Sequence, residues 1–119
     1  MLVVVLTTQV LSDTNKEKIR KRIHELVETT QQSVANNRYS TAGLNAVNTK
    51  PPWLEFKIVY GDVEDKRVCM KIFSHRVNKW DYGLKSQFQK DLLTFLNNLI
   101  GDDDHLVYPV VLEEPAHGI

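Results

Sequence analysis

The chain has 119 residues, and its 15 lysines and arginines balance its 15 aspartates and glutamates, so the formal charge is zero. Hydrophobic residues make up 42% of it and charged residues 25%, which predicts a single folded domain over residues 1–119 and excludes wholesale disorder. The apolar run at residues 1–6 falls far short of the ~20 residues that a membrane helix needs, and the single cysteine excludes an internal disulfide. We therefore expect a cytoplasmic protein with no membrane contact.

The two signs of charge are segregated along the chain. Residues 1–90 hold all 15 basic residues and nine acidic ones, a net charge of +6, whereas residues 91–119 hold only acidic residues and carry −6. This pattern predicts either a dipolar surface, with attraction between neighbouring copies, or two segments that neutralise each other within one chain.

Residues 2–6 are continuously apolar and β-branched, which predicts a buried strand. Thr14 and Glu17 form a capping box, so a helix should begin there. Its buried face is predicted by the spacing of five residues: Ile19, Ile23, Leu26, Thr30 and Val34. Residues 35–52 then break the pattern, and a connection this long is either functional or flexible.

Two strands are expected at residues 53–60 and 66–77, because apolar and polar residues alternate there, and a hairpin loop at 61–65 would join them. After a short aromatic turn at residues 78–83, a second helix is expected over residues 84–100, with Gly101 as its C′ residue. A last strand at 105–112 would lead into a short acidic tail at 113–119.

This order of elements predicts an α+β fold of the ferredoxin-like, split β-α-β type. Such a fold has a four-stranded antiparallel sheet with both helices on one face. The first and third strands would lie in the middle of the sheet. Many unrelated functions use this arrangement, so the fold class does not itself predict one.

The uncovered face of the sheet is the first candidate binding surface. Alternation places six residues on it: Trp53, Lys57, Arg67, Lys71, Phe73 and His75. Exposed apolar and cationic residues favour contact with a protein partner or a second copy. Aromatic residues interleaved with cations also suit single-stranded nucleic acid. However, residues 66–73 lack the glycine and the second aromatic of an RNA recognition motif. The loop 35–52 folding over this face is a further alternative.

A second candidate surface is the aromatic turn, where Lys79, Trp80 and Tyr82 are expected to contact a partner. The alternative is that these aromatic rings anchor the turn against the nearest helix end.

No catalytic constellation is recognisable in the sequence. The aspartates at 102–104 lack the spacing of a calcium loop, and His24 and Glu28 lack the second histidine of a zinc helix. We therefore expect no cofactor, no metal and no enzymatic activity. The sequence instead favours a non-enzymatic interaction or assembly module that self-associates or docks on a larger partner. The alternative is a single-stranded nucleic-acid-binding module that uses the open sheet face.

Overall fold

The computed structural model describes residues 1–7, 10–36, 55–60, 67–103 and 105–115. In chain order these residues form β1 (Leu2–Thr7), α1 (Asp13–Asn36), β2 (Glu55–Tyr60), β3 (Arg67–Phe73), α3 (His75–Asn78), α4 (Tyr82–Ile100), β4 (Leu106–Val107) and β5 (Val111–Glu113). Trp53, the predicted hairpin loop 61–65, most of the predicted loop 35–52 and the end of the predicted tail lie outside the described residues. Across the described part of the chain, no helix is long and apolar enough to cross a membrane.

The sheet is mixed, so the prediction of an antiparallel ferredoxin-like sheet is wrong. The strand order is β2-β1-β3-β4, with β5 also paired to β3. β1 is parallel to β2 on one side and antiparallel to β3 on the other. β4 and β5 are both parallel to β3 and pair with different parts of it. β1 and β3 do lie in the middle, as predicted.

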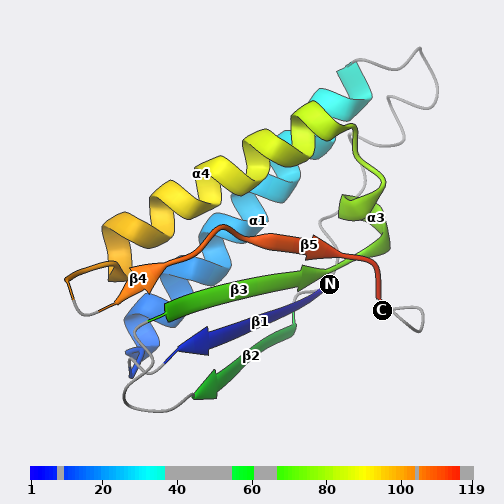
Figure 1. The fold of residues 1–119 in the computed structure, drawn as a ribbon. Coiled ribbons are helices and arrows are strands. Elements are labelled where there is room, and N and C mark those ends of the chain that lie inside the picture. The colour runs from blue at the N-terminus through cyan, green and yellow to red at the C-terminus, as the bar shows by residue number, and fades with distance from the viewer. Residues whose placement is uncertain (8–9, 37–54, 61–66, 104, 116–119) are drawn as a thin grey trace.

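The fold consists of two strand–helix–strand units, which explains the error. β1, α1 and β2 form one unit, and β3, α4 and β5 form the other, because a helix returns the chain to a parallel neighbour in each case (Figure 1). Alternation along a strand shows which residues face the core, but it does not show which strand lies next to it. α1 and α4 lie together on one side of the sheet, as the sequence predicts (Figure 1).

The core lies between this helix pair and the inner face of the sheet. On β1, Val3 and Val5 are buried and alternate with half-buried residues. The helices cover them with fully buried side chains that include Ile23, Phe88 and Leu92. Phe56 and Ile58 of β2 pack against the same cluster. Alternation on β3 and helical spacing on α1 and α4 therefore predict the inner faces, whereas the continuously apolar sequence of β1 does not show which of its residues face inwards.

The ends of the helices depart from the predicted caps. Ser12, not Thr14, caps α1: its Oγ accepts a hydrogen bond from the backbone N–H of Asn15 at 3.1 Å. Gly101 ends α4 with φ −74°, so it is not in the left-handed conformation. A glycine suits this position because a Cβ there would lie 2.7 Å from the backbone oxygen of Asn97.

Two predicted strands are shorter than expected. β3 ends at Phe73 and not at Val77, because Ser74 begins the short helix α3. The predicted last strand is divided into β4 and β5, and between them the backbone N–H of Tyr108 donates to the Val68 oxygen at 2.9 Å. Because β3 ends at Phe73 and α3 begins at His75, the chain turns sharply there, and this turn positions the candidate site.

Candidate functional site

The candidate site lies at one end of the sheet, where the ends of three strands lie side by side. The start of β1 pairs with the end of β3 through Leu2 and Phe73, and Phe73 pairs with Glu113 at the end of β5. The backbone N–H of Ser74 donates to the Glu113 oxygen at 3.1 Å and holds the two chain segments together beyond the ladder. In open α/β sheets, ligands bind outside the carboxyl ends of parallel strands, and β3 and β5 are such a pair.

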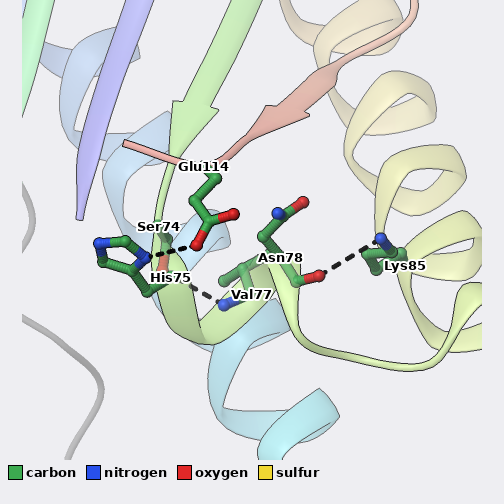
Figure 2. A network of polar contacts seen from close by, with 6 residues as sticks. All are labelled: Ser74, His75, Val77, Asn78, Lys85 and Glu114. Carbon is green, nitrogen blue, oxygen red and sulfur yellow. Dashed lines mark hydrogen bonds and ion pairs between the residues drawn. The ribbon is translucent and has the colours of Figure 1, made fainter. Parts of the chain in front are cut away.

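Hydrogen bonds at both ends of α3 fix the turn that follows β3. Ser74 is buried, and its Oγ accepts a hydrogen bond from the backbone N–H of Val77 at 3.2 Å (Figure 2). Val77 is itself buried in the core. At the other end, Lys85 Nζ donates to the backbone oxygen of Asn78 at 3.4 Å (Figure 2). The residues between these contacts, His75 and Arg76, therefore stand on a fixed backbone.

His75 and Glu114 form the central pair of the site. His75 Nδ1 lies 3.0 Å from Glu114 Oε1, and the two side chains are 40% and 58% exposed. Figure 2 shows the second ring nitrogen on the side of the ring away from Glu114. An ionised carboxylate can only accept a hydrogen bond, so this contact places a proton on Nδ1 and the lone pair of neutral imidazole on Nε2. A carboxylate that orients an imidazole in this way is a recurrent feature of acid–base catalysis.

Charged groups of both signs lie at this end of the sheet. Burial lowers the pKa of the Met1 α-amine below its usual value; Glu55 opposes the shift, and the Arg76 guanidinium adds to it. Arg76 is exposed and follows His75 directly in the chain. Lys71 is also near this end and pairs with Glu113 at 3.3 Å. The cations at this end of the sheet are therefore accompanied by the carboxylates of Glu55, Glu113 and Glu114.

Four of the six residues predicted for the open sheet face share that face in the structure. Lys57, Arg67 and Lys71 are exposed on the strands, and Phe73 is half-buried at the end of β3. His75 is not on the strand at all, since it opens α3. The sequence reasoning missed Arg76 and Glu114. An N-cap serine at position 74 was the available signal for a chain turn before His75.

The three residues predicted for the aromatic turn have different environments. Lys79 is exposed at the C-cap of α3, and Tyr82 is 84% exposed at the start of α4. Trp80 is only 7% exposed, and its ring meets Phe88 edge-on with centroids 5.5 Å apart. A ring enclosed in this way cannot contact a partner, so Trp80 is a core residue and not part of a binding surface.

Polar side chains also meet elsewhere in the described chain, and two of these places resemble a site. His105 Nδ1 lies 2.9 Å from Asp102 Oδ1, but this pair closes a local turn at the amino end of β4. A shallow groove between α1 and α4 is lined by Arg22, Glu25 and Phe95, where the Arg22 guanidinium already contacts both neighbours. Among the described residues, no three His, Cys, Asp or Glu side chains gather so that they could hold a metal ion.

Comparisons with known proteins find similarity among solved structures. No family model and no curated relative matches the chain. Among solved structures, malonate semialdehyde decarboxylase, described for its decarboxylase and hydratase activities, is similar over 100% of this chain and 89% of its own. The identity is 16% and the TM-score 0.45, so this likeness assigns no reaction, substrate or catalytic residue to the chain.

This comparison stands against the functional interpretation of the sequence. A non-enzymatic interaction or assembly module, with its nucleic-acid-binding alternative, was predicted, whereas malonate semialdehyde decarboxylase is an enzyme; the likeness carries no further argument. His75 and Glu114, which the structure brings together, are 39 residues apart in the sequence and match no catalytic motif.

Proposed function

We propose that the chain is an enzyme that transfers a proton on a small carboxylate-bearing substrate. The observation that carries this proposal is the contact of 3.0 Å between His75 Nδ1 and Glu114 Oε1 at the carboxyl ends of β3 and β5. Histidine is the side chain best suited to give and take a proton near neutral pH. The single cysteine, Cys69, supports a reducing compartment such as the cytoplasm for this enzyme.

In this proposal each residue has a separate role. His75 Nε2 takes a proton from the carbon next to a substrate carbonyl, the electron pair of the C–H bond forms an enolate, and the imidazolium later returns a proton. Glu114 holds the ring in the productive tautomer and stabilises the imidazolium. Arg76 binds the substrate carboxylate, for which a guanidinium fork is the best-matched side chain.

The test is proton exchange in D₂O with pyruvate, 2-oxobutanoate and oxaloacetate as probes. We expect the ¹H NMR signal of the protons next to the carbonyl to decay faster with the protein than in buffer. His75→Ala should slow this decay by about 100-fold, the usual scale of a general acid–base group. Arg76→Ala should chiefly raise the pyruvate concentration that gives half of the maximal rate.

His105→Ala is the matched control, because His105 has the same ring nitrogen on a carboxylate at 2.9 Å but lies at the other end of the sheet. It should keep the exchange rate of the unchanged chain. The proposal fails if none of the three acids exchanges faster than in buffer, or if His75→Ala and His105→Ala have equal rates.

A further inference from the structure

The face of the sheet turned away from α1 and α4 carries a second feature, which is independent of His75. Because residues directly opposite each other in a ladder point to the same side, the register defines this outer sheet face. Val3 and Val5 point to the core, so the alternate positions point outwards. The outer sheet face consists of Leu2, Val4, Leu6, Glu55, Lys57, Val59, Arg67, Cys69, Lys71, Phe73, Val111 and Glu113.

Two adjacent rows across this face carry opposite charges. The first row runs through β2, β1, β3 and β5 as Glu55, Leu2, Phe73 and Glu113. The next row, two residues along each strand, runs in the same order as Lys57, Val4, Lys71 and Val111. One row is therefore acidic at both ends, and its neighbour carries two lysines, with apolar residues between them.

These side chains are accessible to a partner. Val59 and Val111 are 40% and 41% exposed, which is high for large apolar residues within strands. The side chains of Lys71 and Glu113 are 53% and 42% exposed although they pair with each other. Leu2, Val4 and Phe73 between them are half-buried. Accessible apolar residues with charged neighbours are typical of an interface.

We infer that a second copy of this chain packs on the outer sheet face, with a two-fold axis parallel to the rows and midway between them. Each acidic row then lies over the lysine row of the other copy, with the strands of the two copies running in opposite directions. Glu55 faces Lys57 of the second copy, Leu2 faces Val4, and Glu113 lies diagonally across from Lys71. Facing sheets pack about 10 Å apart, a distance that the side chains of these two rows can fill.

The charge pattern selects this arrangement over the other face-to-face dimer. An axis parallel to the strands would keep each row over itself and exchange β2 with β5. Glu55 would then face Glu113 of the second copy, and like charges in close contact disfavour association. A two-fold contact is isologous, so the surface has to complement itself, and the two rows do so only when the strands are opposed.

The test is the mass in solution, measured by sedimentation equilibrium from about 1 to about 500 µM protein. We expect a monomer–dimer equilibrium whose dissociation constant rises with salt. Lys57→Glu should raise this constant by about tenfold or more, because the two-fold axis makes each substitution act twice. Combining Glu55→Lys with Lys57→Glu exchanges the two charges and should restore the dimer.

Lys90→Glu is the control, since Lys90 is exposed on α4 away from the sheet. It should leave the dissociation constant unchanged, and circular dichroism should show that every variant is folded. A chain that stays monomeric at the highest concentration overturns the inference. So does a dimer that Lys57→Glu leaves as tight as before, or one that the exchanged pair does not restore.

Discussion

Trp80 anchors the corner that carries the candidate site, and replacing it tests that assignment. The Trp80 ring is 7% exposed and stands at 73° to the Phe88 ring, with the centroids 5.5 Å apart. Trp80→Ala should lower the free energy of unfolding by about 3–5 kcal/mol, because it removes buried area and leaves a cavity. Domains of this kind have total stabilities of about 5–15 kcal/mol, so the variant should be marginal.

The edge-on contact between the two rings contributes a separate part of this loss. A double-mutant cycle of Trp80→Leu with Phe88→Leu should give a coupling of about 0.5–1.5 kcal/mol between the rings. If the rings merely fill neighbouring space without a specific contact, the coupling should be close to zero.

Urea unfolding followed by far-UV circular dichroism is the suitable assay, because Trp53 also contributes to the fluorescence of the chain. Tyr82→Ala is the matched control: this aromatic residue is only two positions away but 84% exposed. It should change the free energy of unfolding by about 0.5 kcal/mol at most. Equal effects of Trp80→Ala and Tyr82→Ala would refute the anchoring role of Trp80.

Three further predictions follow from contacts around the sheet edge and the helix ends. Ser74→Ala leaves the buried N–H of Val77 without its acceptor and should lower the free energy of unfolding in urea by about 1–2 kcal/mol. A loss below about 0.3 kcal/mol would contradict the role of Ser74 as the N-cap of α3. Gly101→Ala should cost about 1–3 kcal/mol in the same assay, because its Cβ meets the Asn97 oxygen at 2.7 Å, and an unchanged midpoint would contradict the close approach. In the chain that begins at Met1, burial lowers the pKa of the α-amine in the folded state. The contribution of this shift to the free energy of unfolding is complete above the unfolded pKa of about 8, and it falls as the pH drops through the folded pKa. Acetic anhydride should therefore label Met1 with a pH midpoint below that of a Met-Leu-Val peptide, and an equal or higher midpoint would contradict the shift.

The helices, the strands and the core follow largely from patterns within single segments. On β3, Val68 and Met70 alternate with outward residues, and Phe88 and Leu92 share one face of α4, so both surfaces can be predicted from spacing alone; the continuously apolar β1 gives no such signal. The charges on the outer sheet face follow from the same alternation. Local hydrophobic spacing thus predicts which side chains are inside, but not how the strands pair.

The pairing and the site depend on residues that are far apart in the sequence. Whether β1 takes β2 as a parallel neighbour is decided by packing of α1 across the sheet, and no local pattern records it. His75 and Glu114 are brought together by the ladder between β3 and β5, although each alone resembles an ordinary surface residue. Motif and spacing arguments therefore named His75 as a candidate, but they could not pair it with Glu114.

The central position of β1 also affects how quickly the chain can fold. Leu2 pairs with Glu55 on one side and with Phe73 on the other, so both of its partners come from much later in the chain. Closing loops of this length opposes early pairing, and folds dominated by distant contacts form slowly. During synthesis β1 emerges before β2 and β3 and remains unpaired until they follow, with its apolar valines and leucines exposed. This topology therefore makes the nascent chain prone to aggregation, and we expect its folding yield to depend on protein concentration.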